Sequence, residues 1–68
     1  MFNIKVGDKV TRIMAGQLMM YLTVTEVTEK RIICGPWEFS RKTGLEIDED
    51  LGWTENASGS YLLPKESM

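Results

Sequence analysis

Histidine is absent from the 68-residue sequence, and cysteine occurs once, at Cys34. A single cysteine cannot form a disulfide within the chain, and without histidine the commonest general base and metal ligand are both missing. A disulfide framework and a histidine-based zinc site are therefore excluded. Small domains without such cross-links often rely on oligomerisation or on unusually good packing. We therefore expect a homodimer or an assembly with another protein partner.

Basic residues are also few, with eight Lys and Arg against ten Asp and Glu and a net charge of −2. This balance disfavours a dedicated nucleic-acid binder, which normally carries a basic face. No stretch approaches the ~20 apolar residues of a membrane-spanning helix. The first five residues lack the charged and then apolar pattern of a secretory signal. We therefore expect a cytoplasmic protein without membrane attachment.

Hydrophobic residues alternate with polar ones on both sides of a polar turn in the middle of the chain. A period of two predicts half-buried strands. The turn, Arg41-Lys42-Thr43-Gly44, ends on a glycine suited to the positive φ of a short hairpin loop. We expect this hairpin to place Phe39 opposite Leu45 and Trp37 opposite Ile47 on its buried side.

The same register directs Glu38 and Glu46 to the solvent, where a like-charged pair contributes nothing to stability. Other β-prone runs are separated by turn signals at 7–8, 29–30 and 35–36. The sequence predicts further strands at 10–13, 18–28, 31–34 and 60–64, and loops at 15–17 and 54–60. No segment has a convincing helical pattern.

The first half of the chain carries a sequence pattern in three parts. It consists of Val6-Gly7-Asp8-Lys9-Val10, then Val-Thr-Glu-Val at 24–27 and Ile-Ile-Cys at 32–34. This pattern resembles the start of SH3-like barrels of the KOW type, and it is similar to small bacterial proteins that begin in this way. The resemblance implies a small β-barrel. Residues 37–53 depart from the KOW pattern, so no ribosomal or nucleic-acid role is carried over.

Together these patterns predict an all-β fold, either a small SH3-like barrel or a strongly bent antiparallel sheet of five or six strands. Residues 1–64 form one predicted domain, and residues 65–68 form a predicted flexible tail. The predicted core is Val6, Val10, Leu22, Val24, Ile32, Phe39, Leu45, Ile47 and Leu62, with Trp37 and Trp53 partly buried.

Residues 18–22 form an uninterrupted apolar run, Leu-Met-Met-Tyr-Leu. In a strand such a run makes both faces apolar, which requires cover on both sides. A small single sheet does not easily supply that cover, so we predict a protein–protein contact here. The alternative is that Met19 or Tyr21 lies under a loop of the same chain. Tryptophan is enriched at interface hot spots, although Trp53 could equally cap its own core. The candidate interface residues are Leu18, Met19, Met20, Tyr21 and Trp53.

We predict no catalytic residue, no metal site and no cofactor. Cys34 follows two isoleucines, whereas a nucleophilic cysteine needs an electropositive and partly exposed setting. We therefore interpret it as a core residue. The carboxylates of Asp48, Glu49 and Asp50 offer oxygen ligands of the kind that hard cations prefer, but the calcium-loop spacing is absent. A solvated charge run that blunts a sheet edge is the alternative, and the sequence leaves open whether this segment binds a cation.

The sequence therefore predicts a non-enzymatic protein-binding or assembly module that associates with itself through residues 18–22. The alternative is a small β-barrel that binds nucleic acid. In that case basic turn residues would contact phosphates while bases stack on Trp37 or Phe39. The candidate contacts for this alternative are Lys30, Arg31, Arg41 and Lys42.

Overall fold

In a computed structural model, which describes residues 4–14 and 17–63, the chain is all-β, as predicted. The strands are β1 (Lys9–Met14), β2 (Leu18–Thr23), β3 (Glu26–Val27), β4 (Arg31–Cys34), β5 (Trp37–Ser40), β6 (Glu46–Ile47) and β7 (Ser60–Leu63). The described residues thus contain seven strands, more than predicted, because the run at 18–28 divides into β2 and β3. They contain no helix that could cross a membrane. The predicted tail at 65–68 and most of the predicted loop at 15–17 lie outside the described residues.

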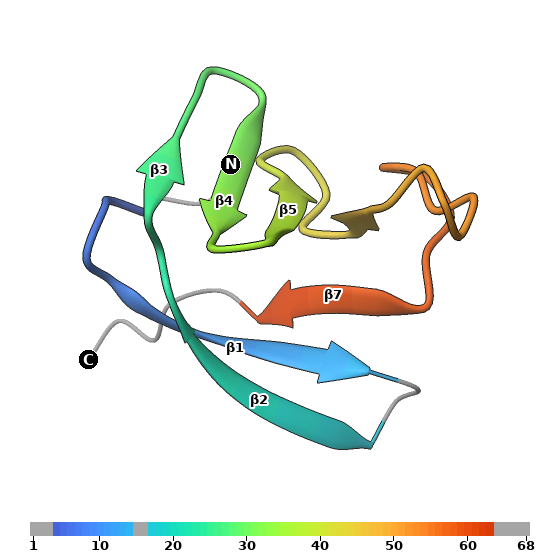
Figure 1. Ribbon diagram of the computed structural model, residues 1–68, viewed down its shortest axis with the longest axis horizontal. Helices are drawn as coiled ribbons and strands as arrows, with labels where there is room; N and C mark the ends of the chain where they lie inside the picture. Colours follow the sequence, from blue (N-terminus) through green and yellow to red (C-terminus); the bar gives the residue numbers. More distant parts are fainter. Residues whose placement is uncertain (1–3, 15–16, 64–68) are drawn as a thin grey trace.

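The strands form two antiparallel sheets, with orders β2-β1-β7 and β3-β4-β5-β6 (Figure 1). The sheets do not close into a barrel, which corrects the barrel prediction. The chain crosses between them just after β2. Val24 N–H still donates at 2.9 Å to the C=O of Asp8, just before β1 of the first sheet, whereas Thr25 N–H donates to Ile33 C=O of the second sheet at 2.8 Å. One continuous stretch therefore belongs to both sheets.

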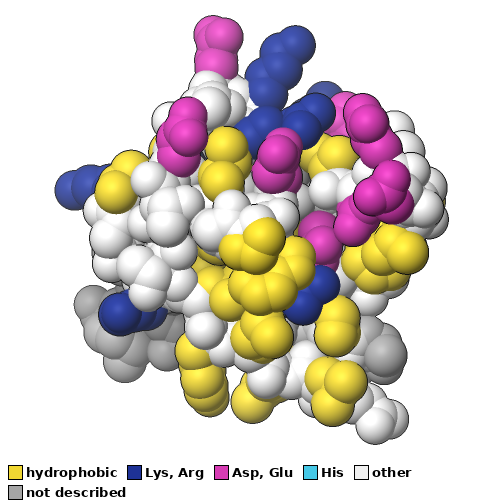
Figure 2. All heavy atoms as spheres, in the orientation of Figure 1, with side chains coloured by type: hydrophobic (Ala, Val, Ile, Leu, Met, Phe, Trp, Pro, Cys, Tyr) yellow, Lys and Arg dark blue, Asp and Glu magenta, His cyan; other side chains and the backbone are white. Residues whose placement is uncertain are grey.

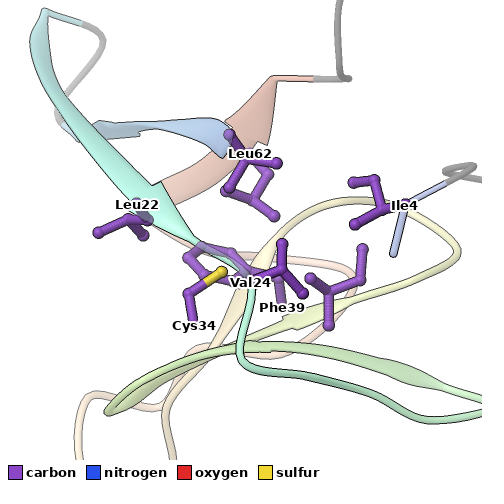
Figure 3. Packing of buried hydrophobic residues seen from close by; sticks show 8 residues of the cluster. Ile4, Leu22, Val24, Cys34, Phe39 and Leu62 are labelled. Carbon is purple, nitrogen blue, oxygen red and sulfur yellow. The ribbon is translucent and has the colours of Figure 1, made fainter. Parts of the chain in front are cut away.

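The hydrophobic core lies between the two sheets, where side chains from both meet (Figure 3). Phe39 and Ile32, a cross-strand pair of β5 and β4, are fully buried at its centre. Most predicted core residues are confirmed. Val6 is an exception and is exposed, because it lies in the tight turn before β1, and Ile4 takes a place in the core instead. The buried cluster is Ile4, Val10, Leu22, Val24, Ile32, Cys34, Phe39 and Leu62, with Val27 and Trp37 packed against it.

The central hairpin forms, but with a register one residue away from the predicted one. Phe39 pairs with Glu46 rather than with Leu45, and Glu38 pairs with Ile47. The loop holds four residues because Gly44, at φ 81°, donates its N–H to Ser40 C=O at 2.8 Å. A shift of one residue turns every side chain of a strand to the other face.

Three consequences follow from this register. Glu46, expected in solvent, is buried on the core side beside Phe39. Leu45 and Ile47, expected in the core, are half-buried on the opposite face. The two tryptophans are half-buried, as predicted.

Candidate protein interface

The predicted interface run lies on β2, one of the two edge strands of the three-stranded sheet. Its first four side chains are exposed, and those of Met19 and Tyr21 have 60% and 75% of their surface open to solvent. Leu22, at the end of the run, is buried in the core. No loop of the described residues therefore covers the apolar side chains of Met19 or Tyr21, which was the alternative to a partner chain.

The register of the sheet assigns the β2 side chains to two faces. Val10 pairs with Leu22, and both belong to the core cluster. Successive side chains of a strand point to opposite faces, so Met19 and Tyr21 project away from the core. Met20 points to the core side, where its sulfur lies 3.9 Å from Arg12 Nη1.

A continuous apolar row crosses the outward face. Met19 pairs with Ile13 of β1, Ile13 pairs with Tyr61 of β7, and Tyr61 forms an isolated bridge with Leu45. Ile13 is only 6% exposed, although it is not part of the core cluster. Its burial is explained by neighbours on its own face. We call the group Ile13, Met19, Tyr21, Leu45, Tyr61 and Leu63 the outer-face patch.

Charged side chains are sparse around β2. Acidic side chains gather over the upper and right-hand parts of the molecule, whereas the lower edge, where β2 lies, shows hydrophobic side chains and no acidic ones (Figure 2). The strand itself reads LMMYLT and contains no charge, proline or glycine. Charged residues and prolines usually protect sheet edges from pairing, and β2 contains neither.

Trp53, the fifth predicted interface residue, belongs to a different part of the surface. It pairs with Asp48 across a tight turn. Its ring lies so close to Gly59 that a Cβ atom added to this glycine would lie 2.8 Å from Cζ2 of Trp53. It also lines a shallow hollow together with Lys30, Arg31 and Ile47. The structure therefore gives Trp53 a packing role within its own chain and does not add it to the outer-face patch.

The structure brings together the two basic turns of the nucleic-acid alternative. Arg41 N–H donates to Lys30 C=O at 3.0 Å, and Lys30, Arg41 and Lys42 line a second hollow. The acidic side chains of Glu29 and Glu55 line this hollow as well. Opposite charges are therefore interleaved, and the turns do not form a purely basic surface.

Two of these basic side chains are already engaged. Arg31 Nη1 contacts Glu38 at 2.9 Å, and Arg41 Nη1 donates to Thr28 C=O at 2.9 Å. The aromatic side chains proposed for base stacking are also occupied. Phe39 is fully buried, and the Trp37 ring lies under Arg12.

The acidic segment after β6 folds into a tight turn. Asp48 Oδ1 accepts hydrogen bonds from the backbone N–H groups of Asp50 and Leu51, at 3.0 and 3.3 Å. Within residues 4–14 and 17–63, no group of three or more acidic or cysteine side chains is arranged to hold a metal ion. The carboxylate of Asp48 thus serves the turn in this structure.

Sequence patterns missed a buried ion pair in the core. Arg12 Nη2 lies 2.8 Å from Glu46 Oε1, and Arg12 Nε donates to the same oxygen at 2.9 Å. The guanidinium carbon lies 4.9 Å from the centroid of the Trp37 ring. Arg12 interrupts the alternating apolar residues of β1 at an inward position, and this was the one available signal for a buried charge.

Cys34 is buried in the core, and desolvation by that burial raises the pKa of its thiol above the ordinary value. Because the thiolate is the reactive form, we expect slow reaction of native protein with a chromogenic disulfide reagent at pH 8. Labelling should be complete and rapid in denaturant. Rapid labelling of the native protein would contradict the buried position of Cys34, and free cysteine provides the reference rate.

Comparisons with protein-family models, with curated proteins and with solved structures found no match for this chain.

Proposed function

We propose that the protein is a non-enzymatic assembly module that associates with a second copy of itself through β2. The observation that carries this proposal is the exposure of four consecutive apolar side chains, Leu18 to Tyr21, on an edge strand. Contiguous exposed apolar surface on a small protein commonly marks an interaction site. An interface of this kind has an apolar centre and a polar rim.

The surroundings of β2 support this proposal. Met19 and Tyr21 extend the outer-face patch around the almost fully covered Ile13. Polar residues border the patch, because Lys9 and Thr23 form the next cross-strand pair and their side chains hydrogen-bond at 3.0 Å. The low net charge of −2 opposes the approach of a second copy only weakly.

The nucleic-acid alternative receives less support from the same residues. Its basic turns contain interleaved acidic side chains, and its aromatic side chains are buried or covered.

Light scattering after size-exclusion chromatography, at tens of micromolar protein, tests the proposal. We expect the wild-type mass to be twice the 7.8 kDa of one chain. Met19→Lys should shift the mass to that of the monomer, because a buried unpaired charge in the interface is strongly unfavourable. Far-UV circular dichroism should show that the variant remains folded.

Leu51→Lys is the matched control for this experiment. Leu51 is 58% exposed, close to the 60% of Met19, but it lies in the turn after β6. The two variants carry the same change of charge and each replaces an exposed apolar side chain, so they differ mainly in the location of the lysine. The proposal is wrong if the wild-type protein stays monomeric across the concentration range, or if Leu51→Lys dissociates it as fully as Met19→Lys.

A further inference from the structure

Backbone geometry gives the free edge of β2 a defined set of hydrogen-bonding groups. Alternate residues of an antiparallel strand direct their N–H and C=O groups to opposite sides. Val24 exchanges hydrogen bonds with Gly7 and Asp8 on the β1 side. Counting back by twos, Leu22, Met20 and Leu18 face β1, so the backbone groups of Met19 and Tyr21 face outward. No strand of residues 4–14 or 17–63 lies along that edge.

β2 differs in this respect from the other sheet edges. β3 and β6, the two edges of the second sheet, have only two residues each. β7 is joined to the hairpin by the Leu45–Tyr61 bridge and by Leu62 N–H, which donates to Gly44 C=O at 2.8 Å. β2 has six residues without charge or proline, and a long edge of this kind is a template for pairing with another strand.

From these observations we propose that two copies join edge to edge, with β2 antiparallel to the partner's β2, in one continuous six-stranded sheet. This inference rests on the proposed function and specifies its geometry. A two-fold axis at Met20 places the apolar run on itself, with Leu18 opposite Leu22 and Met19 opposite Tyr21. The polar residues Gln17 and Thr23 then face each other at both ends of the run.

The neighbouring register explains the choice of axis. An axis at Tyr21 would place Met19 opposite the polar Thr23. It would also leave Leu18 without an opposite residue in the partner's β2, because that strand ends at Thr23. The axis at Met20 also merges the two outer-face patches, because Met19 and Tyr21 of both copies lie on the same face of the joined sheet. Isologous two-fold contacts of this kind are the commonest interfaces of homodimers.

Disulfide cross-linking tests the axis. Met20 would be a self-paired position without direct backbone hydrogen bonds, where Cα atoms approach to about 4.5 Å, within the range that a disulfide spans. Met20→Cys should therefore form a covalent dimer on mild oxidation. Leu63→Cys, on the outer-face patch but on β7, should not cross-link above the wild-type level, and the wild-type chain provides the background from buried Cys34.

The outcomes separate the geometry from the function on which it rests. Cross-linking of Leu63→Cys without Met20→Cys indicates stacked sheet faces and overturns the edge inference, while self-association stands. Cross-linking of Tyr21→Cys instead of Met20→Cys overturns the Met20 axis. A wild-type protein that is monomeric in light scattering overturns both proposals.

A proline substitution tests the edge hydrogen bonds independently. Tyr21→Pro removes an N–H group that faces outward and takes no part in the bonds to β1, and edge strands tolerate proline there. Tyr21→Ala removes the same side chain but keeps the N–H. We expect at least a tenfold larger dimer dissociation constant for Tyr21→Pro than for Tyr21→Ala, with both monomers folded by circular dichroism. Equal dissociation constants would overturn backbone pairing at this edge.

Discussion

Replacing Arg12 with alanine should destabilise the protein by about 3–5 kcal/mol, because the substitution leaves a buried carboxylate without its partner. Glu46 Oε1 accepts from Arg12 at 2.8 and 2.9 Å, and both side chains are almost completely buried. A chain of this size has a total free energy of unfolding of about 3–10 kcal/mol. The loss is therefore a large fraction of the total stability, and at the lower end of that range the variant is largely unfolded at room temperature. Urea denaturation followed by tryptophan fluorescence measures the change.

Two further variants give this prediction its controls. Arg31 and Glu38 form an ion pair of nearly the same length, 2.9 Å, but both side chains are exposed. Arg31→Ala should cost about 1 kcal/mol or less, as surface pairs do. Replacing both buried partners, Arg12→Met with Glu46→Leu, should recover most of the lost stability, because no unpaired charge is left. A cost for Arg12→Ala no greater than for Arg31→Ala would contradict the buried pair.

Replacing Phe39 with alanine should cost about 3–5 kcal/mol through lost burial and the cavity that remains. Phe39 is fully buried and is packed against Ile32 on the neighbouring strand. The surrounding structure relaxes only partly into such a cavity, and a domain this small has few other core side chains that could fill it. Thermal unfolding by circular dichroism and urea titration should both report the loss.

Leu45→Ala is the informative comparison for Phe39→Ala. In the register predicted from the sequence, Phe39 and Leu45 are partners in the core. In the structure Leu45 is half-buried on the opposite face and bridges to Tyr61. We therefore expect a cost of about 1–2 kcal/mol for Leu45→Ala, in proportion to the smaller apolar area removed from water. Equal costs for the two substitutions would favour the predicted register over the observed one.

The strands and their turns could be predicted from local patterns. The alternation around residues 41–44 predicts the central hairpin, and Gly35 and Gly44 adopt the positive φ values, 63° and 81°, that such turns need. The exposed apolar run was visible as well, because five apolar residues in one strand cannot all face a single core. These features depend on neighbours within a few residues, and sequence periodicity reports such neighbours directly.

The register of the hairpin could not be predicted in the same way. A loop of three residues and a loop of four both fit the polar segment 41–44, and they differ by one residue in pairing. Ser40 selects the longer loop, because its Oγ accepts the N–H groups of Lys42 and Thr43 at 3.0 and 3.1 Å. That single choice buries Glu46 and moves Leu45 to the outer face.

By itself, the sequence determined an all-β chain, the positions of its turns and the surplus of apolar residues in one strand. Tertiary structure decided which residues meet across long separations, as Arg12 and Glu46 do from strands 34 residues apart. It also placed β2 at an edge, where its surplus apolar side chains are left uncovered. The physical reason is that periodicity fixes which side chains share a face of a strand, whereas the packing of the two sheets fixes which faces are covered.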